Sequence, residues 1–201
     1  NKEDVKIISS RRWTTDLSPA MFEKVTGLSS YPPYLEKDVD GNTLKVYSNG
    51  EINYTLKGVH AKVSVIWNYE APEGTGDTHY SIMRGSNCQL EIRQGEAEGY
   101  KPTLYIQPAS TDTPDEFRRQ VESAVRQVAE KYPGITLTET DELSWRVGIP
   151  DSYKVGHEAH FGQVTEKYLD YLAKGSLPQW EIPNMIVKYY TTTEGLRLAL
   201  D

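Results

Sequence analysis

The sequence is poor in several residue types, and each shortage excludes a class of protein. Among its 201 residues it has one cysteine, Cys88, which rules out a disulfide within the chain and a cluster of cysteines around a metal. No apolar run approaches the roughly 20 residues that a helix needs to span a bilayer. We therefore expect a soluble domain without a membrane span, and a chain this long can bury a core without a metal or a disulfide.

Concentrated positive charge is also missing. The chain carries 22 Lys and Arg against 29 Asp and Glu, for a net charge of −7, and its longest basic cluster is the pair Arg11 and Arg12. Because nucleic-acid binding draws most of its affinity from clustered positive charge, we expect no nucleic-acid partner. Composition and charge do not distinguish a cytoplasmic from a periplasmic location.

The first part of the chain has clear boundary signals for secondary structure. A strand is expected near Lys6 to Trp13. The segment "LSPAMFEKVTG" predicts a short helix, with Ser18 as N-cap, Pro19 at the first helical position and Gly27 as the stop. The Pro-containing segment that follows, "SSYPPYLEKDVDGN", is interpreted as a loop.

The next segment, "TLKVYSNGEINYTLKGVHAKVSVIWNYEAP", alternates with a period of two. Asn49-Gly50 predicts one hairpin turn and Lys57-Gly58 a second, which gives an antiparallel meander of three runs. In the third run one face is expected to carry Val59, Ala61, Val63, Val65, Trp67 and Tyr69, and the other His60, Lys62, Ser64 and Asn68.

Further strands are expected to extend the same sheet, and helices follow them. "TPDEFRRQVESAVRQVAEKYPG" opens with a capping box from Thr113 to Glu116 and carries apolar residues at helical spacing. The expected strands lie near residues 78–84, 89–93, 103–107, 135–140 and 143–149, and the expected later helices near 158–173 and 184–200. Without regular βαβ alternation, this order predicts an α+β fold, with an open-faced, mostly antiparallel sheet and helices packed on one face.

The loop "GTGDTH" is the first candidate site. Asp77, Thr78 and His79 place a carboxylate, a hydroxyl and an imidazole in succession, all groups that bind sugar or polyol hydroxyls, and binding groups favour loops on rigid sheets. The alternative is a surface connection whose glycines serve only its geometry. A dinucleotide-binding loop is rejected, because the third glycine is missing and a strand rather than a helix is expected next.

"GHEAHFGQV" is the second candidate, with His157 and His160 at a helix start. The histidines lie three apart, unlike the four of the HExxH zinc motif, and a third metal ligand would have to come from His60 or His79. The alternative is a histidine packed at the mouth of the core, because His157, Phe161, Val164 and Tyr168 share one stripe. We predict no metal site; a metal-dependent hydrolase is the lesser alternative.

Two long segments also carry a family resemblance. "GEINYTLKGVHAKVSVIWNYEAPEGTGDTHYSIMRGSNCQLEIRQG" and "VGHEAHFGQVTEKYLDYLAKGSLPQWEIPNMIVKYYTTTEGLRLAL" resemble the C-terminal domain of oxidoreductases in the glucose-fructose oxidoreductase, inositol dehydrogenase and MocA superfamily. "IMRGSNCQLEI" resembles its G-x-x-G-x-L turn, with Cys88 in place of the second glycine. The resemblance covers essentially residues 1–201, expected to form a single C-terminal domain.

The resemblance implies a division of labour with a second domain. Members pair an N-terminal Rossmann domain, which holds NAD or NADP, with an open-faced sheet that shapes the substrate site and mediates oligomerisation. The chain begins "NKEDVKIISS", without an initiator Met, and is interpreted as a fragment whose Rossmann domain and catalytic residues lie upstream. We expect a homo-oligomer that acts on a sugar or polyol, with no catalytic or cofactor-binding residue in this fragment.

The substrate-contacting residues are expected near the turn. Family members place such side chains in the loop before it, which corresponds here to residues 75–79. We predict Asp77 and His79, with His60 and Lys62 as neighbours on an adjacent strand and His157 as a weaker candidate. The alternatives are a stand-alone module that binds glycans or small polyols, and an NAD-dependent glycosidase of the same superfamily.

Overall fold

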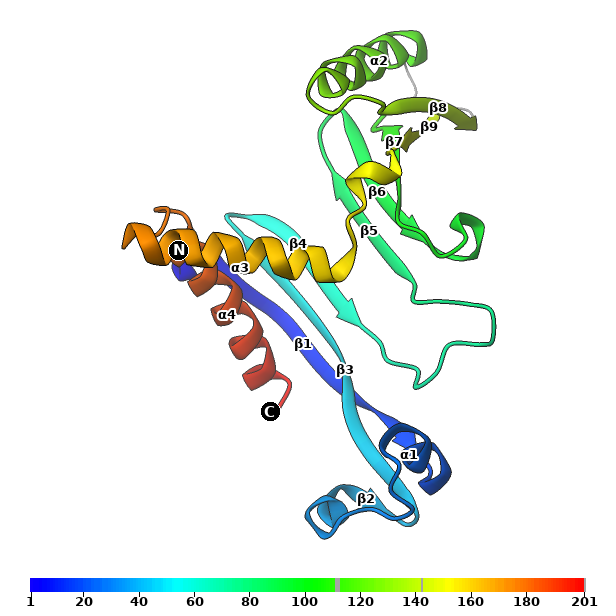
Figure 1. Ribbon diagram of the computed structural model, residues 1–201, viewed down its shortest axis with the longest axis vertical. Helices are drawn as coiled ribbons and strands as arrows, with labels where there is room; N and C mark the ends of the chain where they lie inside the picture. Colours follow the sequence, from blue (N-terminus) through cyan, green and yellow to red (C-terminus); the bar gives the residue numbers. More distant parts are fainter. Residues whose placement is uncertain (111–112, 142, 201) are drawn as a thin grey trace. The chain divides into compact units, whose positions relative to one another are not determined.

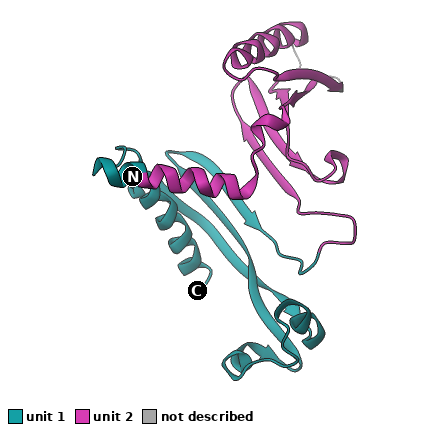
Figure 2. Cartoon of the chain, in the orientation of Figure 1, with its two compact units in different colours: residues 1–70, 170–201 teal, residues 71–169 magenta. Residues whose placement is uncertain are grey.

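The computed structural model describes residues 1–110, 113–141 and 143–200, and it divides into two compact units. Unit 1 comprises residues 1–70 and 170–201, and unit 2 comprises residues 71–169 (Figures 1 and 2). The fold is α+β, and every strand pairing described is antiparallel, as the sequence predicts. No helix within these ranges is long and apolar enough to cross a membrane.

Unit 1 is built on a four-stranded sheet with two helices. The strands are β1 (Val5–Leu17), β2 (Val39–Asp40), β3 (Thr43–Leu56) and β4 (Val59–Val65), and β3 pairs with the other three. The short helix α1 (Pro19–Thr26) begins and ends as predicted, because Ser18 accepts a hydrogen bond from the Met21 amide and Gly27 adopts φ +74°. Helix α4 (Glu181–Leu198) lies along β1 (Figure 1).

The hairpin predicted at Asn49-Gly50 is wrong. Strand β3 continues through both residues, and the chain turns only at Lys57-Gly58, where both residues adopt positive φ as a type I′ turn requires. Asn49 is buried, and its side chain donates to the Trp13 carbonyl and accepts from the Trp67 amide at 2.7 Å. These long-range bonds hold Asn49 in an extended strand, beside a β-bulge between β1 and β3.

Unit 2 is built on a separate five-stranded sheet, so the later strands do not extend the first one. Its order is β5-β6-β7-β9-β8, formed by β5 (His79–Arg84), β6 (Cys88–Gln94), β7 (Thr103–Pro108), β8 (Thr136–Asp141) and β9 (Ser144–Gly148). The strands lie where the alternation predicts them. What the alternation does not reveal is that β5 pairs with β6 and not with β4.

Helix α2 (Pro114–Lys131) covers one face of this second sheet. Phe117 and Val121 are buried against Trp145 of β9, with the Phe117 and Trp145 rings 5.4 Å apart. The helix begins at the predicted place, but the predicted capping box is wrong, because the Thr113 side chain makes no capping hydrogen bond. The Thr113 carbonyl still accepts the first hydrogen bond of the helix, from the Phe117 amide.

The remaining helix, α3 (Gly156–Lys174), begins in unit 2, and its last residues belong to unit 1. None of its residues is buried.

Unit 1 has its own core around Leu17, Phe22 and Leu44, onto which Trp67 and Tyr69 pack, as the alternation of the third run predicts. Val59, Val63 and Val65 of that run are exposed instead, because α4 packs mainly on β1 and not on β4.

Candidate functional site

The loop before β5 presents Asp77 and His79 to solvent, and Gln94 links this loop to the sheet. Gln94, opposite His79 in the register of β5 and β6, donates its amide to the Asp77 carbonyl at 2.8 Å. Both candidate side chains are exposed. The exposed carboxylate and imidazole therefore stand two residues apart at the beginning of a fixed strand, where both can bond the hydroxyl groups of a ligand.

The glycines of the loop have structural roles. Gly74 adopts φ +79°, and the amide and hydroxyl of Thr75 both donate to the Pro72 carbonyl, at 3.0 and 2.6 Å. Gly76 packs against Tyr100, whose Cβ would lie 3.3 Å from an added Cβ. Strand β5 follows the loop, so no helix N-terminus is available for a pyrophosphate. This loop does not fit a dinucleotide.

The predicted neighbours, His60 and Lys62, lie in the other sheet. Both are on β4, which pairs with β3 and not with β5, so the prediction that they sit on the strand adjacent to His79 is wrong. His60 is exposed and lies opposite Thr55. The mistake arises because consecutive strands pair in most proteins, whereas here the chain leaves the first sheet after β4.

Lys62 belongs to an ion-pair cluster on β3. Its ammonium lies 2.8 Å from the Glu51 carboxylate, which also lies 3.4 Å from the Arg11 guanidinium. The hydrogen bond from Lys62 is the largest of the effects that lower the pKa of Glu51 to about 2, and Arg11 and Asn53 add to it against the cost of desolvation. Glu51 is thus a carboxylate held ionised by its neighbours.

His157 lies in the first turn of α3, with its ring 4.9 Å from that of Phe161. The alternative that placed this histidine at the mouth of the core is wrong, because its side chain is 79% exposed. Among the described residues, no group of three or more His, Cys, Asp or Glu side chains could hold a metal ion. His157 and Asp77 are therefore interpreted as exposed hydrogen-bonding groups and not as metal ligands.

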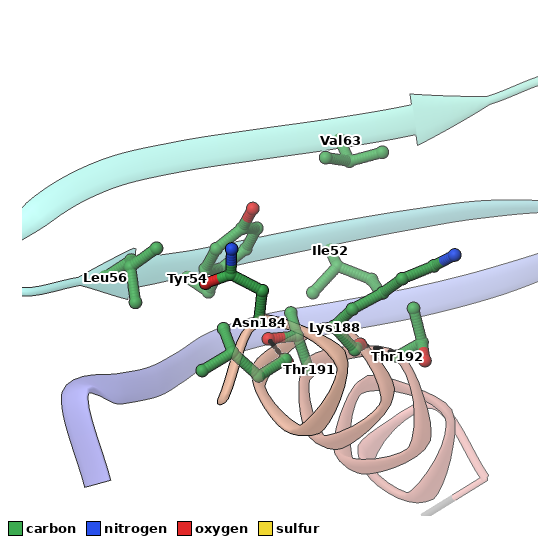
Figure 3. A pocket seen from close by; sticks show the side chains of 9 residues that line it. Ile52, Tyr54, Leu56, Val63, Asn184, Lys188, Thr191 and Thr192 are labelled. Carbon is green, nitrogen blue, oxygen red and sulfur yellow. Dashed lines mark hydrogen bonds between the residues drawn. The ribbon is translucent and has the colours of Figure 1, made fainter. Parts of the chain in front are cut away.

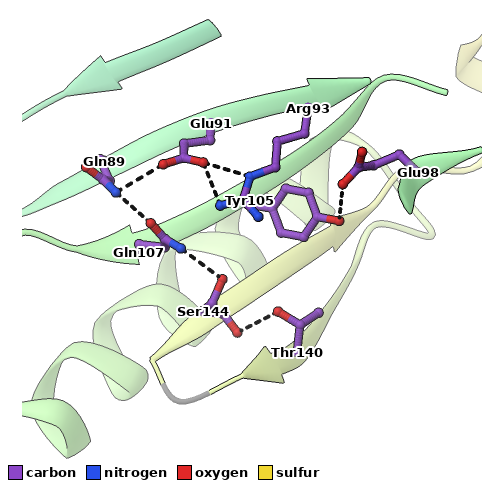
Figure 4. Close-up of polar contacts among 8 residues, drawn as sticks. All are labelled: Gln89, Glu91, Arg93, Glu98, Tyr105, Gln107, Thr140 and Ser144. Carbon is purple, nitrogen blue, oxygen red and sulfur yellow. Dashed lines mark hydrogen bonds and ion pairs between the residues drawn. The ribbon is translucent and has the colours of Figure 1, made fainter. Parts of the chain in front are cut away.

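A polar network that we did not predict covers the other face of the second sheet (Figure 4). At its centre Glu91, only 6% exposed, is paired with Arg93 at 2.6 Å and accepts from the Gln89 amide at 3.1 Å. Gln89 also donates to Gln107, which in turn donates to the Ser144 hydroxyl. Burying a carboxylate costs free energy unless it is paired and hydrogen-bonded. The contacts with Arg93 and Gln89 therefore compensate for the burial of Glu91 on this face of the sheet.

Tyr105 connects this network to the turn after β6. Its ring lies under the Arg93 guanidinium at 4.6 Å, and its hydroxyl donates to Glu98 at 3.2 Å. Burial raises the pKa of Tyr105, and the bond to Glu98 raises it further, so the phenol stays protonated as a donor. The pKa of Arg93 is also raised, mainly by its hydrogen bond to Glu91.

The signal for this network is in the sequence. In "CQLEIRQ" the polar residues Gln89, Glu91 and Arg93 alternate with Leu90 and Ile92, and a strand places such alternating residues on opposite faces. His79 pairs with Gln94, and Gln94 is an odd number of residues from Glu91 and Arg93. His79 therefore lies on the opposite face of the sheet from the network.

Unit 1 contains a groove of about 380 Å³ between α4 and the strands β3 and β4 (Figure 3). The side formed by the strands is mainly apolar and includes the aromatic ring of Tyr54. Asn184, Lys188 and Thr192 project from α4 along the groove. The hydroxyls of Thr191 and Thr192 bond carbonyls of their own helix. Lys188 is the one charged group among the described lining residues, so the groove offers apolar contact rather than acid–base chemistry. Its complete lining is Ile52, Tyr54, Leu56, Val63, Asn184, Val187, Lys188, Thr191 and Thr192.

Known proteins resemble this chain over nearly its whole length. Residues 1–200 match the family described as "Putative oxidoreductase C terminal domain". A crystal structure described as that of "a putative oxidoreductase from Parabacteroides merdae ATCC 43184" is 50% identical in sequence and has a TM-score of 0.96 over 98% of this chain. This chain spans only 45% of that protein. No curated protein matches.

Proposed function

Because this chain belongs to the "Putative oxidoreductase C terminal domain" family, we propose that it is the substrate-side and oligomerisation domain of an NAD(P)-dependent oxidoreductase acting on a sugar or polyol. The parent would be a member of the glucose-fructose oxidoreductase, inositol dehydrogenase and MocA superfamily. A C-terminal domain implies an N-terminal partner domain, to which we assign the Rossmann fold. The observation that carries the proposal is the exposed pair Asp77 and His79 at the beginning of β5.

The pair suits a polyol because both groups can bond hydroxyls. A carboxylate accepts hydrogen bonds, and a neutral imidazole both donates and accepts, so together they can bind neighbouring hydroxyls of one sugar. The bond from Gln94 to the Asp77 carbonyl links this loop to β6, which reduces the entropy lost on binding. His60, Lys62 and His157 are kept as lesser candidates for substrate contact.

NAD or NADP is proposed for the parent and not for this domain. The coenzyme would supply the hydride acceptor, and the Gly74–Gly76 loop does not fit it, because Gly76 packs on Tyr100 and a strand follows. In this division of labour Asp77 and His79 position the substrate. They transfer no proton, which is the task of residues in the N-terminal domain.

The test is steady-state kinetics of the full-length parent with a panel of sugars and polyols. In the His79→Ala variant we expect KM to rise much more than kcat falls, with a loss of about 1–3 kcal/mol in kcat/KM if one buried hydrogen bond to substrate is lost. His160→Ala, which removes an exposed histidine not assigned to substrate, is the matched control.

Each other outcome has a definite meaning. Unchanged kinetics in His79→Ala would place this loop outside the substrate site. A fall in kcat alone would make His79 catalytic, contrary to our assignment. Cleavage of glycosides without net reduction of the coenzyme would favour the glycosidase of the same superfamily.

A further inference from the structure

Helix α3 carries an apolar stripe of exposed side chains. Phe161, Val164 and Tyr168, here called the α3 stripe, are spaced three and four residues apart and so lie on one face of the helix. Their exposed fractions are 63%, 66% and 61%. The ring of His157 contacts Phe161 at 4.9 Å and extends the same face by one turn.

Such a helix needs a partner to be stable. Most helical stability in proteins comes from packing an apolar face rather than from intrinsic helix propensity. Helix α3 has no buried residue, and Gly162 within it lowers its intrinsic helix propensity. Large exposed apolar side chains gathered on one face are typical of a docking surface.

We propose that the α3 stripe is the surface on which the N-terminal domain of the parent oxidoreductase packs. This inference rests on the proposed function, and it assigns to that domain a specific contact. The similar Parabacteroides merdae protein keeps the fold of this chain over 98% of its residues, while more than half of that protein lies outside the match. The parent therefore has ample chain to cover the stripe.

A domain of the same chain is a better occupant than a second copy. A tethered domain is present at an effective concentration of about millimolar, so it covers an apolar stripe before a free molecule does. Two aromatic anchors, Phe161 and Tyr168, around an aliphatic centre at Val164 also match the composition of the buried part of a protein interface.

The first measurement is hydrogen exchange of the full-length parent over residues 156–169. We expect these amides to be protected, and the protection to be independent of protein concentration. Exchange as fast as in an exposed helix would overturn the proposal. Protection that disappears on dilution, together with a fall in mass from dimer to monomer, would also overturn it in favour of a second copy.

Variants of the parent give the second measurement. Val164→Asp puts a charge into the stripe, and we expect at least about a tenfold loss of protection in α3, with faster proteolytic separation of the two domains. Gln163→Asp adds the same charge on the exposed opposite side of the helix, and it should behave like the wild type. If Val164→Asp fails to fold, Val164→Ala should give the same loss of protection and faster proteolysis to a smaller degree. Protection and proteolysis that are equal in Val164→Ala and Gln163→Asp would contradict the proposed docking surface.

These readouts are independent of the coenzyme. Titration of the same parent with NAD(H) and NADP(H) reports on the proposed function, whereas exchange in α3 reports on docking alone. A parent that binds coenzyme but leaves α3 unprotected contradicts the docking surface only. A protected α3 in a parent that binds neither coenzyme contradicts the proposed oxidoreductase only.

Discussion

Glu51 shows how a single residue of this domain is fixed by its neighbours. It lies on β3 between Lys62 of β4 and Arg11 of β1, and its pKa is lowered to about 2. Lys62 is thus already engaged by a carboxylate, which makes it a weaker candidate for substrate contact than Asp77 or His79. The sequence correctly predicted a strand at Lys62, but it wrongly placed that strand beside His79 and did not reveal the ion pair with Glu51.

The pH dependence of stability should reveal this cluster. Because the folded pKa of Glu51 is below its ordinary value of 4.5, the carboxylate stabilises the fold above about pH 4.5, and this contribution is lost as pH falls toward 2. Glu51→Gln should therefore lower Tm at pH 7 and lose less stability than the wild type on acidification. Thermal melts between pH 7 and pH 3 check this, with Glu166→Gln on exposed α3 as control; identical pH profiles for all three proteins would contradict it.

Most secondary structure elements were predictable, because their signals are local. Ser18 and Gly27 fix the ends of α1, and the alternation in "CQLEIRQ" gives β6. Asn49-Gly50 misled the prediction because the signal for a turn is local, whereas the bonds of Asn49 to Trp13 and Trp67 come from distant segments. Tertiary contacts here override turn propensity.

Two glycines in helices allow a matched test of how closely a helix packs on the sheet. In α4 a Cβ on Gly195 would lie 2.7 Å from the terminal methyl of Ile52, so the close approach of helix and sheet requires glycine there. We expect Gly195→Ala to destabilise the fold by about 1–3 kcal/mol, toward the lower value if Ile52 can rotate away.

Gly162 in α3 is the matched control, because nothing lies within 4 Å of its added Cβ. Gly162→Ala should therefore stabilise by up to about 1 kcal/mol through helix propensity alone. Chemical denaturation of both variants is the measurement. A stabilising Gly195→Ala would show that α4 does not pack closely on Ile52.

For the whole molecule, the sequence predicts the class of fold but not the division of the strands between two separate sheets. The strands of both sheets have the same alternation, and only long-range pairing decides that β5 joins β6, β7, β9 and β8 instead of β4. Long-range strand pairing also limits what the sequence predicts about the candidate site. Asp77 and His79 could be selected by residue type and by resemblance, whereas the network around Glu91 depends on which strands lie beside β6.

We propose that this domain supplies the substrate side of an oxidoreductase whose coenzyme is held elsewhere in the parent. The most direct measurement is calorimetric titration of NAD(H) and NADP(H) into the full-length parent and, in parallel, into a protein consisting of residues 1–201 whose folding has been checked by circular dichroism. We expect the parent to bind one of the two coenzymes and residues 1–201 to bind neither measurably. Micromolar binding by residues 1–201, or binding of neither coenzyme by the parent, would contradict it.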